Sequence, residues 1–137
     1  MKYMLDTDIC IYVIKKKPDR VLAALHAGVQ EGIAISAITL AELEYGVEAS
    51  AHVEKNTLAL NQFLSIMSIL PFEDKAAVEY GKIHADLRRK GMLIGSMDML
   101  IAAHAKSKGL ILVTNNIREF ERVEGLKLEN WSHTADG

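Results

Sequence analysis

Residues 3–14 read YMLDTDICIYVI, a short apolar run, an Asp-Thr-Asp step and a second apolar run. The first run predicts a buried strand over residues 2–5, and the second predicts a mostly buried helix over 7–16. Asp6 then lies at the carboxyl end of a strand, and sites in parallel sheets lie beyond these ends. The simpler alternative is that Asp6 or Thr7 only caps the helix that follows.

The same alternation of short apolar strands and longer helices continues along the chain. Further strands are predicted at 33–36, 66–70, 110–113 and 127–128. Further helices are predicted at 19–27, 39–50, 52–65, 73–90, 98–108 and 116–121. Short buried strands that alternate with helices are typical of an α/β fold, with a short, mainly parallel central sheet flanked by helices on both faces.

Length and composition exclude several classes of protein. The chain has 137 residues, 50% of them hydrophobic, which suits one domain with its own core and argues against disorder. Its longest apolar run, 9–14, is far shorter than the ~18 residues that span a bilayer, and Asp6 and Asp8 interrupt any secretory signal. A net charge of −2 excludes a strongly basic protein that coats nucleic acid. The single Cys10 indicates a buried apolar position, so we expect a reducing, cytoplasmic location.

Glu42 is an acid in an unusual position. In a helix over 39–50 it falls on the inner face, among apolar residues such as Ile38 and Tyr45. A carboxylate on that face needs a partner, because burying an unpaired charge is costly. The alternative is a capping box, in which Thr39 caps the helix and Glu42 bonds back to it.

Two later acids stand near other predicted strand and helix ends. Asp98 begins the helix 98–108, where the helix N-terminus favours an ionised carboxylate; an ordinary preference for negative charge in a first turn is the alternative. Glu119 follows the strand 110–113 and the Thr-Asn-Asn step 114–116. Taken alone, Glu119 is typical of a solvated helix residue.

Together these acids predict a metal site at one edge of the sheet. Two unscreened carboxylates ~4 Å apart repel by about 4 kcal/mol at an effective dielectric constant of ~20. No Lys or Arg is adjacent in sequence to Asp6, Glu42 or Asp98 to offset that repulsion. Oxygen ligands favour Mg²⁺ or Mn²⁺ over zinc, and such an ion suits phosphodiester cleavage.

Four stretches occur in order along the chain: MLDTDICIY (4–12), ITLAELEYG (38–46), DMLIAAHA (98–105) and LVTNNIREF (112–120). Together they resemble the motifs of PIN-domain ribonuclease toxins of the VapC type, over about residues 2–131. The resemblance implies a PIN-like three-layer fold. It further implies a single PIN domain over residues 1–132, followed by a short C-terminal tail at 133–137.

The resemblance also implies an activity and a site. The activity is that of a type II toxin, an endoribonuclease dependent on Mg²⁺ or Mn²⁺ that cleaves structured RNA to inhibit translation. The suggested substrate is tRNA, with initiator tRNA as one possibility. Asp6, Glu42 and Asp98 match the three core acids, which act in catalysis and as metal ligands. The fourth acidic position falls on Asn116 or, in chains with this Thr-Asn-Asn pattern, on Glu119.

The same resemblance implies roles for the residues next to these acids and the partners that the chain binds. Thr7, Asp8, Thr114 and Asn116 would support the ligands; the role of Asp8 and the number of metal ions stay open. A homodimer is implied, as is a VapB-type antitoxin whose C-terminal tail occupies the groove. Operator DNA would be bound only through the antitoxin complex, and no membrane partner is expected.

RNA must reach an acidic site, so local basic residues would have to attract it. The candidates are Lys15, Lys16, Arg88 and Arg118, although each also suits an ordinary solvated surface. The five histidines are expected to take no part in the chemistry, and His104 to be a helix-surface or packing residue.

Three other kinds of protein compete with the ribonuclease as interpretations of the sequence. A small Asp-x-Asp phosphatase fits the step from Asp6 to Asp8, but Cys10 stands where it needs Thr or Val, and its paired acids are missing around Asp98. A phospho-receiver domain needs an aspartate at a mid-chain strand end, where this chain has Pro71. The third is a catalytically silent PIN-like module that binds a partner through the same groove. An assay for metal-dependent RNA cleavage distinguishes this module from the enzyme.

Overall fold

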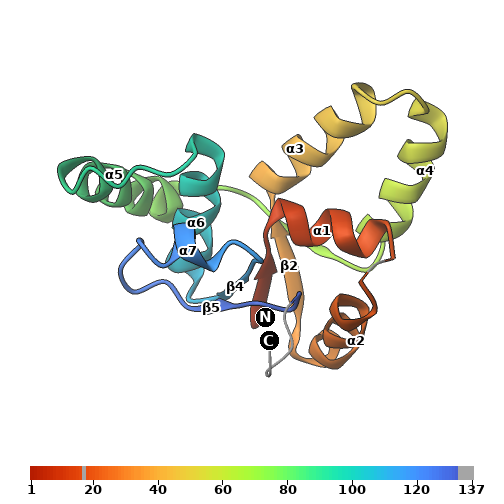
Figure 1. The fold of residues 1–137 in the computed structure, drawn as a ribbon, viewed down its shortest axis with the longest axis horizontal. Coiled ribbons are helices and arrows are strands. Elements are labelled where there is room, and N and C mark those ends of the chain that lie inside the picture. Colours follow the sequence, from red (N-terminus) through yellow and green to blue (C-terminus); the bar gives the residue numbers. More distant parts are fainter. Residues whose placement is uncertain (17, 133–137) are drawn as a thin grey trace.

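Five short strands form one parallel sheet in the order β3-β2-β1-β4-β5 (Figure 1). The computed structural model describes residues 1–16 and 18–132, so the expected tail at 133–137 lies outside the described residues. The strands are β1 (Tyr3–Leu5), β2 (Ile33–Ser36), β3 (Ser68–Leu70), β4 (Ile111–Val113) and β5 (Leu128–Glu129). The expected parallel sheet is confirmed.

Helices cover both faces of the sheet and give the expected three layers (Figure 1). They are α1 (Thr7–Ile14), α2 (Asp19–Gly28), the 3₁₀ helix η1 (Val29–Glu31), α3 (Ala37–Glu48), α4 (Val53–Leu64), α5 (Asp74–Arg89), α6 (Ser96–Lys108) and α7 (Ile117–Phe120). Helices α1 to α4 pack on one face, and α5, α6 and α7 pack on the other. None of the helices within the described residues is long and apolar enough to cross a membrane.

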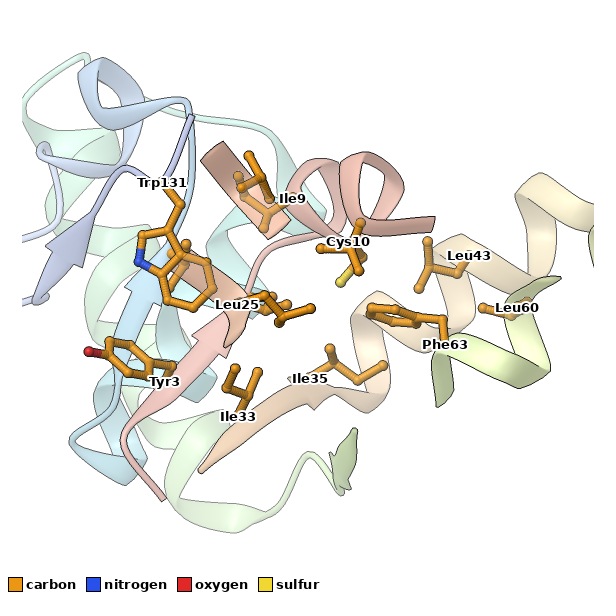
Figure 2. Close-up of a cluster of buried hydrophobic side chains, with 14 of the residues drawn as sticks. Tyr3, Ile9, Cys10, Leu25, Ile33, Ile35, Leu43, Leu60, Phe63 and Trp131 are labelled. Carbon is orange, nitrogen blue, oxygen red and sulfur yellow. The ribbon is translucent and has the colours of Figure 1, made fainter. Parts of the chain in front are cut away.

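The strands are apolar throughout because both of their faces are buried. Tyr3 and Leu5 point into the cluster beneath α1 to α4, part of which Figure 2 shows, whereas Met4 points into the cluster beneath α5 and α6. In β4, Val113 likewise belongs to the first cluster and Leu112 to the second. Successive side chains of a strand alternate between faces, so a strand covered on both sides needs an unbroken apolar sequence.

Helix α3 begins earlier than the sequence predicts. Ser36 ends β2 and also caps α3, its hydroxyl oxygen accepting the Ile38 backbone N–H at 3.0 Å. Thr39 therefore lies inside the helix, fully buried, and the capping-box interpretation of Glu42 is wrong. Helix α6 likewise begins at Ser96, which makes Asp98 its third residue rather than its first.

Helix α6 ends at Lys108, where the predicted helix 98–108 also ends, and Gly109 caps it in the left-handed conformation with φ +66°. A Cβ added to Gly109 meets nothing within 4 Å, so only backbone conformation opposes a side chain there. We expect Gly109→Ala to lower the free energy of unfolding by about 1 kcal/mol. Gly81→Ala, in the open middle of α5, is the matched control and should raise it by roughly 0.5–1 kcal/mol. Urea denaturation measures both, and equal effects would refute the assignment.

Candidate active site

The ends of the two central strands bring the first polar groups together. β1 pairs with β4 so that Leu5 faces Val113, and the backbone N–H of Asp6 donates to the Val113 carbonyl at 2.9 Å. Asp6 and Thr114, the residues that follow the two strands, are therefore neighbours. Both are buried.

Asp6 caps a helix and also belongs to the acidic cluster. Its carboxylate accepts the Ile9 backbone N–H at 2.9 Å, which makes it the N-cap of α1. The pKa of Asp6 is raised to about 6, mainly by burial and in small part by the charges of Asp8 and Asp98, while hydrogen bonds from Thr114 and Ile9 oppose the rise. The capping interpretation and the site interpretation of Asp6 are therefore compatible.

Glu42 projects from the inner face of α3 toward the start of α1. The Thr7 hydroxyl donates to its Oε1 at 2.7 Å, and the Thr39 hydroxyl lies 3.3 Å from that of Thr7. A hydroxyl has one proton, so Thr7 gives its own to the carboxylate and accepts from Thr39. The sequence interpretation of Thr39 as a helix cap concealed this role. The signal that could have revealed it is Ser36, a better-placed cap three residues earlier.

Asp98 is the second acid whose pKa is raised, again to about 6. Its partial burial is the main cause, followed by the charges of Glu119, Glu42 and Asp8. Asp8 itself is exposed. Carboxylates from α1, α3, α6 and α7 and from the end of β1 therefore act on one another at one edge of the sheet.

The donor set of this cluster fits a hard divalent cation. It is made of carboxylate oxygens, which Mg²⁺ and Mn²⁺ prefer, and burial with like charges leaves Asp6 and Asp98 poorly stabilised when ionised. A cation would remove that penalty. Within residues 1–16 and 18–132, no three acidic, His or Cys side chains already stand close enough together to enclose a metal ion. The side chains would therefore have to move closer around one.

The Thr-Asn-Asn step organises the loop beside these acids. The backbone N–H of Asn116 donates to the Thr114 hydroxyl at 2.9 Å, and the Asn115 amide donates to the Tyr12 hydroxyl at 2.6 Å. Of the two residues proposed for the fourth acidic position, Glu119 is the one whose charge acts on Asp98. The contact between Asn115 and Tyr12 was not predicted, because the two residues stand 103 positions apart.

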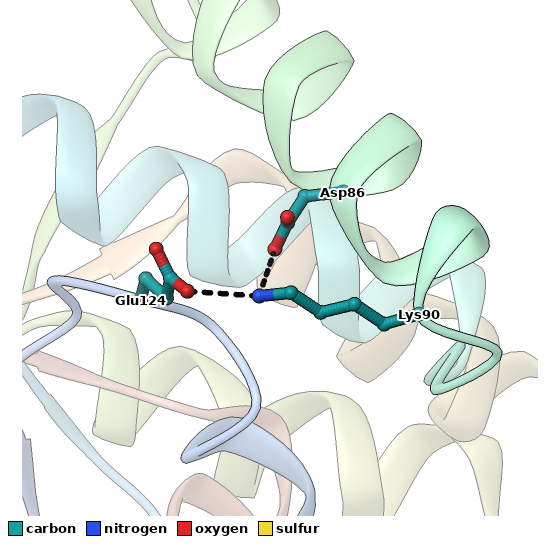
Figure 3. A network of polar contacts seen from close by, with 3 residues as sticks. All are labelled: Asp86, Lys90 and Glu124. Atoms are coloured by element: carbon teal, nitrogen blue, oxygen red, sulfur yellow. Dashed lines mark hydrogen bonds and ion pairs between the residues drawn. The ribbon is translucent and has the colours of Figure 1, made fainter.

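All four basic residues proposed for RNA contact are exposed. They are Lys15, Lys16, Arg88 and Arg118. Arg118 precedes Glu119 on α7, and Lys15 ends α1. Lys90, close to Arg88, is instead held by Asp86 at 3.0 Å and Glu124 at 2.8 Å (Figure 3).

A groove of about 380 Å³ lies between α1, α3 and α4, and it meets the acidic cluster at Glu42. Glu42 lies in its wall, and apolar residues such as Ile11, Leu43 and Leu60 line much of the rest. Lys15 lies beside them. The groove therefore offers apolar surface next to the acids, with a positive charge at its edge.

This arrangement of strands and acids is that of a known family. The sequence profile described as PIN domain matches residues 3–126. The chain therefore belongs to the PIN-domain family.

Within that family, the similar proteins are VapC ribonucleases. The chain is 50% identical to Ribonuclease VapC2 of Haemophilus influenzae and 44% identical to the tRNA(fMet)-specific endonuclease VapC of Salmonella typhimurium; each match covers 96% of this chain and 98% of the relative. A crystal structure of VapBC2 from Rickettsia felis, bound to a DNA fragment from its promoter, superimposes with a TM-score of 0.92 at 47% identity. That match covers 96% of this chain and 99% of the other.

Proposed function

We propose that this chain is the toxin of a toxin–antitoxin pair, a divalent-metal-dependent endoribonuclease that cleaves tRNA, with initiator tRNA as its first candidate substrate. The observation that carries the proposal is the convergence of Asp6, Glu42 and Asp98 at one edge of the sheet. The relative in Salmonella typhimurium named for tRNA(fMet) supports the choice of substrate.

Each acid has a definable part in such a reaction. Asp6, Glu42 and Asp98 would hold Mg²⁺ or Mn²⁺, with Glu119 as the fourth acid beside Asp98. When bound, the ion supplies Lewis-acid activation of water and stabilises the negative charge that develops on the leaving oxygen. The Ile9 amide keeps Asp6 in place, and the Thr7 hydroxyl orients Glu42. Hydrolysis of this kind leaves a 5′-phosphate and a 3′-hydroxyl.

The groove between α1, α3 and α4 suits the partner of such a toxin. Its apolar lining and its position beside Glu42 would let a VapB-type antitoxin segment bind there and cover the acids at the same time. The solved VapBC2 relative is a complex bound to promoter DNA. In this proposal the chain works as a cytoplasmic homodimer and reaches operator DNA only through its antitoxin.

One assay tests the activity directly. Purified protein is incubated with total tRNA in Mg²⁺, in Mn²⁺ and in excess EDTA, and the products are resolved on a denaturing gel and their ends identified. We expect one or few discrete cuts with either metal and none in EDTA. Full activity in EDTA, or a 2′,3′-cyclic phosphate end, would refute the mechanism. Tight RNA binding without cleavage would favour a catalytically silent module.

The contact between Thr7 and Glu42 gives a quantitative test of the site. Thr7→Val keeps the shape of the side chain but removes the hydroxyl that donates to Glu42 at 2.7 Å. Loss of a residue that orients a metal ligand costs roughly 10–100-fold in activity or metal affinity. We expect a loss of that size in the tRNA cleavage rate, with Thr7→Ser close to wild type. Equal activity in the two variants would show that the hydroxyl is dispensable.

A further inference from the structure

A buried hydrogen bond joins the two elements that carry Glu42 and Asp98. The Nδ1 of His104, on α6, lies 2.7 Å from the Oγ of Ser36, the residue that ends β2 and caps α3. Both side chains are fully buried, and the two residues stand 68 positions apart in sequence. The bond therefore ties α6 to the start of α3 inside the core.

The direction of this bond follows from the tautomer of His104. The Ser36 oxygen already accepts the Ile38 backbone N–H and keeps its own proton; when the neutral ring carries its proton at Nε2, Nδ1 accepts that Ser36 proton. Burial lowers the pKa of His104, and Lys108 lowers it further, which keeps the ring neutral. Phe72 packs edge-on against the ring with centroids 5.4 Å apart and holds its orientation.

Ser36 and His104 are each separated from one of the two acids by the same number of residues. Glu42 follows Ser36 by six residues along α3, and Asp98 precedes His104 by six residues along α6. Six residues of α-helix rise roughly 9 Å. If α3 or α6 rotates or slides at the bond between Ser36 and His104, the acid on that helix moves with it. The distance from the bond to the acid is similar on the two helices.

We propose that Ser36 and His104 are positioning residues that set the separation of Glu42 and Asp98 for divalent-cation binding. The inference rests on the proposed metal-dependent activity. A positioning role for His104 can be told from a packing role. Packing needs only the shape of the ring, whereas positioning needs a hydrogen-bonding atom at Nδ1.

Three substitutions of one residue separate these roles. His104→Asn places a polar atom where Nδ1 lies, His104→Gln places one where Nε2 lies, and His104→Phe keeps only a ring. Among the described residues, Nε2 has no partner at hydrogen-bond geometry, and the Pro71 carbonyl is the backbone group that acts on the ring, so a polar atom at Nε2 cannot replace the contact with Ser36. Ser36→Ala removes the hydroxyl from the other side, but it also removes the N-cap of α3, so its result is compared with those of the His104 variants, which leave the cap in place.

Mn²⁺ binding is measured by calorimetry, and tRNA cleavage as separate kcat and KM values. For His104→Phe, His104→Gln and Ser36→Ala we expect Mn²⁺ binding weakened and kcat lowered by about tenfold, with KM for tRNA unchanged. His104→Asn should stay within about twofold of wild type in both. Equal losses in the Asn and Gln variants, or wild-type Mn²⁺ binding by His104→Phe, would overturn the inference.

A second measurement needs neither metal nor activity. Amide ¹H–¹⁵N spectra of the metal-free proteins report the surroundings of Glu42 and Asp98, whose signals should shift in the Phe and Gln variants and stay in place in the Asn variant. If wild type neither binds Mn²⁺ nor cleaves RNA, the proposed function fails, and these signals still decide the positioning. Unmoved signals in His104→Phe would contradict it.

Discussion

Asp6→Asn is expected to lower the rate of tRNA cleavage by about a thousandfold, or ~4 kcal/mol of transition-state stabilisation. The substitution removes the negative charge of the most buried acid in the cluster. It should leave the fold intact, because Asn caps a helix as well as Asp does and can still accept the Ile9 N–H. The initial rate of cleavage of purified tRNA, measured in saturating Mg²⁺, gives the ratio.

The matched control is Asp19→Asn. Asp19 is likewise an aspartate at the start of a helix, but it is the first residue of α2 and is exposed. Its substitution should change the cleavage rate by less than about twofold. If Asp6→Asn retained wild-type activity, or if the two variants lost activity equally, Asp6 would have no part in the chemistry.

Asp98→Asn should have two opposite effects, abolishing cleavage while stabilising the metal-free protein. The pKa of Asp98 is raised to about 6 by burial and by neighbouring acids, so its ionised form is disfavoured in the folded state. At about pH 7.5 in EDTA we expect the variant to gain about 1–2 kcal/mol in free energy of unfolding, a value reduced for the partial exposure of the side chain.

The dependence of this gain on pH follows from the sign of the shift. An acid whose folded pKa lies above its unfolded value binds its proton more tightly in the folded state, so stability falls as pH rises from about 4 to 6. At about pH 4.5 the wild-type carboxyl is already protonated in the folded state. The gain in free energy of unfolding from Asp98→Asn should therefore be smaller there than at about pH 7.5. Urea denaturation at the two pH values measures it.

Two comparisons control this experiment. Mg²⁺ should stabilise the wild-type protein more than the variant, because only the wild type keeps all the proposed ligands. Asp74→Asn, an exposed aspartate in the first turn of α5, should lose a few tenths of a kcal/mol through the helix dipole and keep full cleavage activity. An Asp98→Asn variant that is no more stable than wild type in EDTA would show that neither burial nor the neighbouring acids disfavour the ionised Asp98 in the folded state.

The strands and the acids were readable from the sequence because both follow simple periodic rules. The predicted strand over 33–36 coincides with β2, and an acid directly after the run at Tyr3–Leu5 had to lie at a strand end. The start of helix α3 was predicted wrongly because two nearby residues could both cap it. Both Ser36 and Thr39 carry a hydroxyl suited to capping, and only the backbone geometry shows that Ser36 does so.

The supporting contacts of the site were not readable, because they join residues far apart in sequence. Thr7 meets Glu42 across 35 positions, and His104 meets Ser36 across 68. No periodicity relates such pairs, and a buried histidine on an apolar helix face is typical of packing. The sequence therefore predicts which residues carry charge at the sheet edge, but not which side chains hold them in place.

The strand order also determines when, during synthesis, the acidic cluster can become complete. β1 is made first, yet it lies between β2 and β4, and β4 with the adjoining α7 is made near the end of the chain. Until those residues have left the ribosome, the central strand lacks one neighbour and the acidic cluster lacks Glu119. A nascent chain of the proposed ribonuclease would therefore lack a complete acidic cluster until its synthesis is nearly finished.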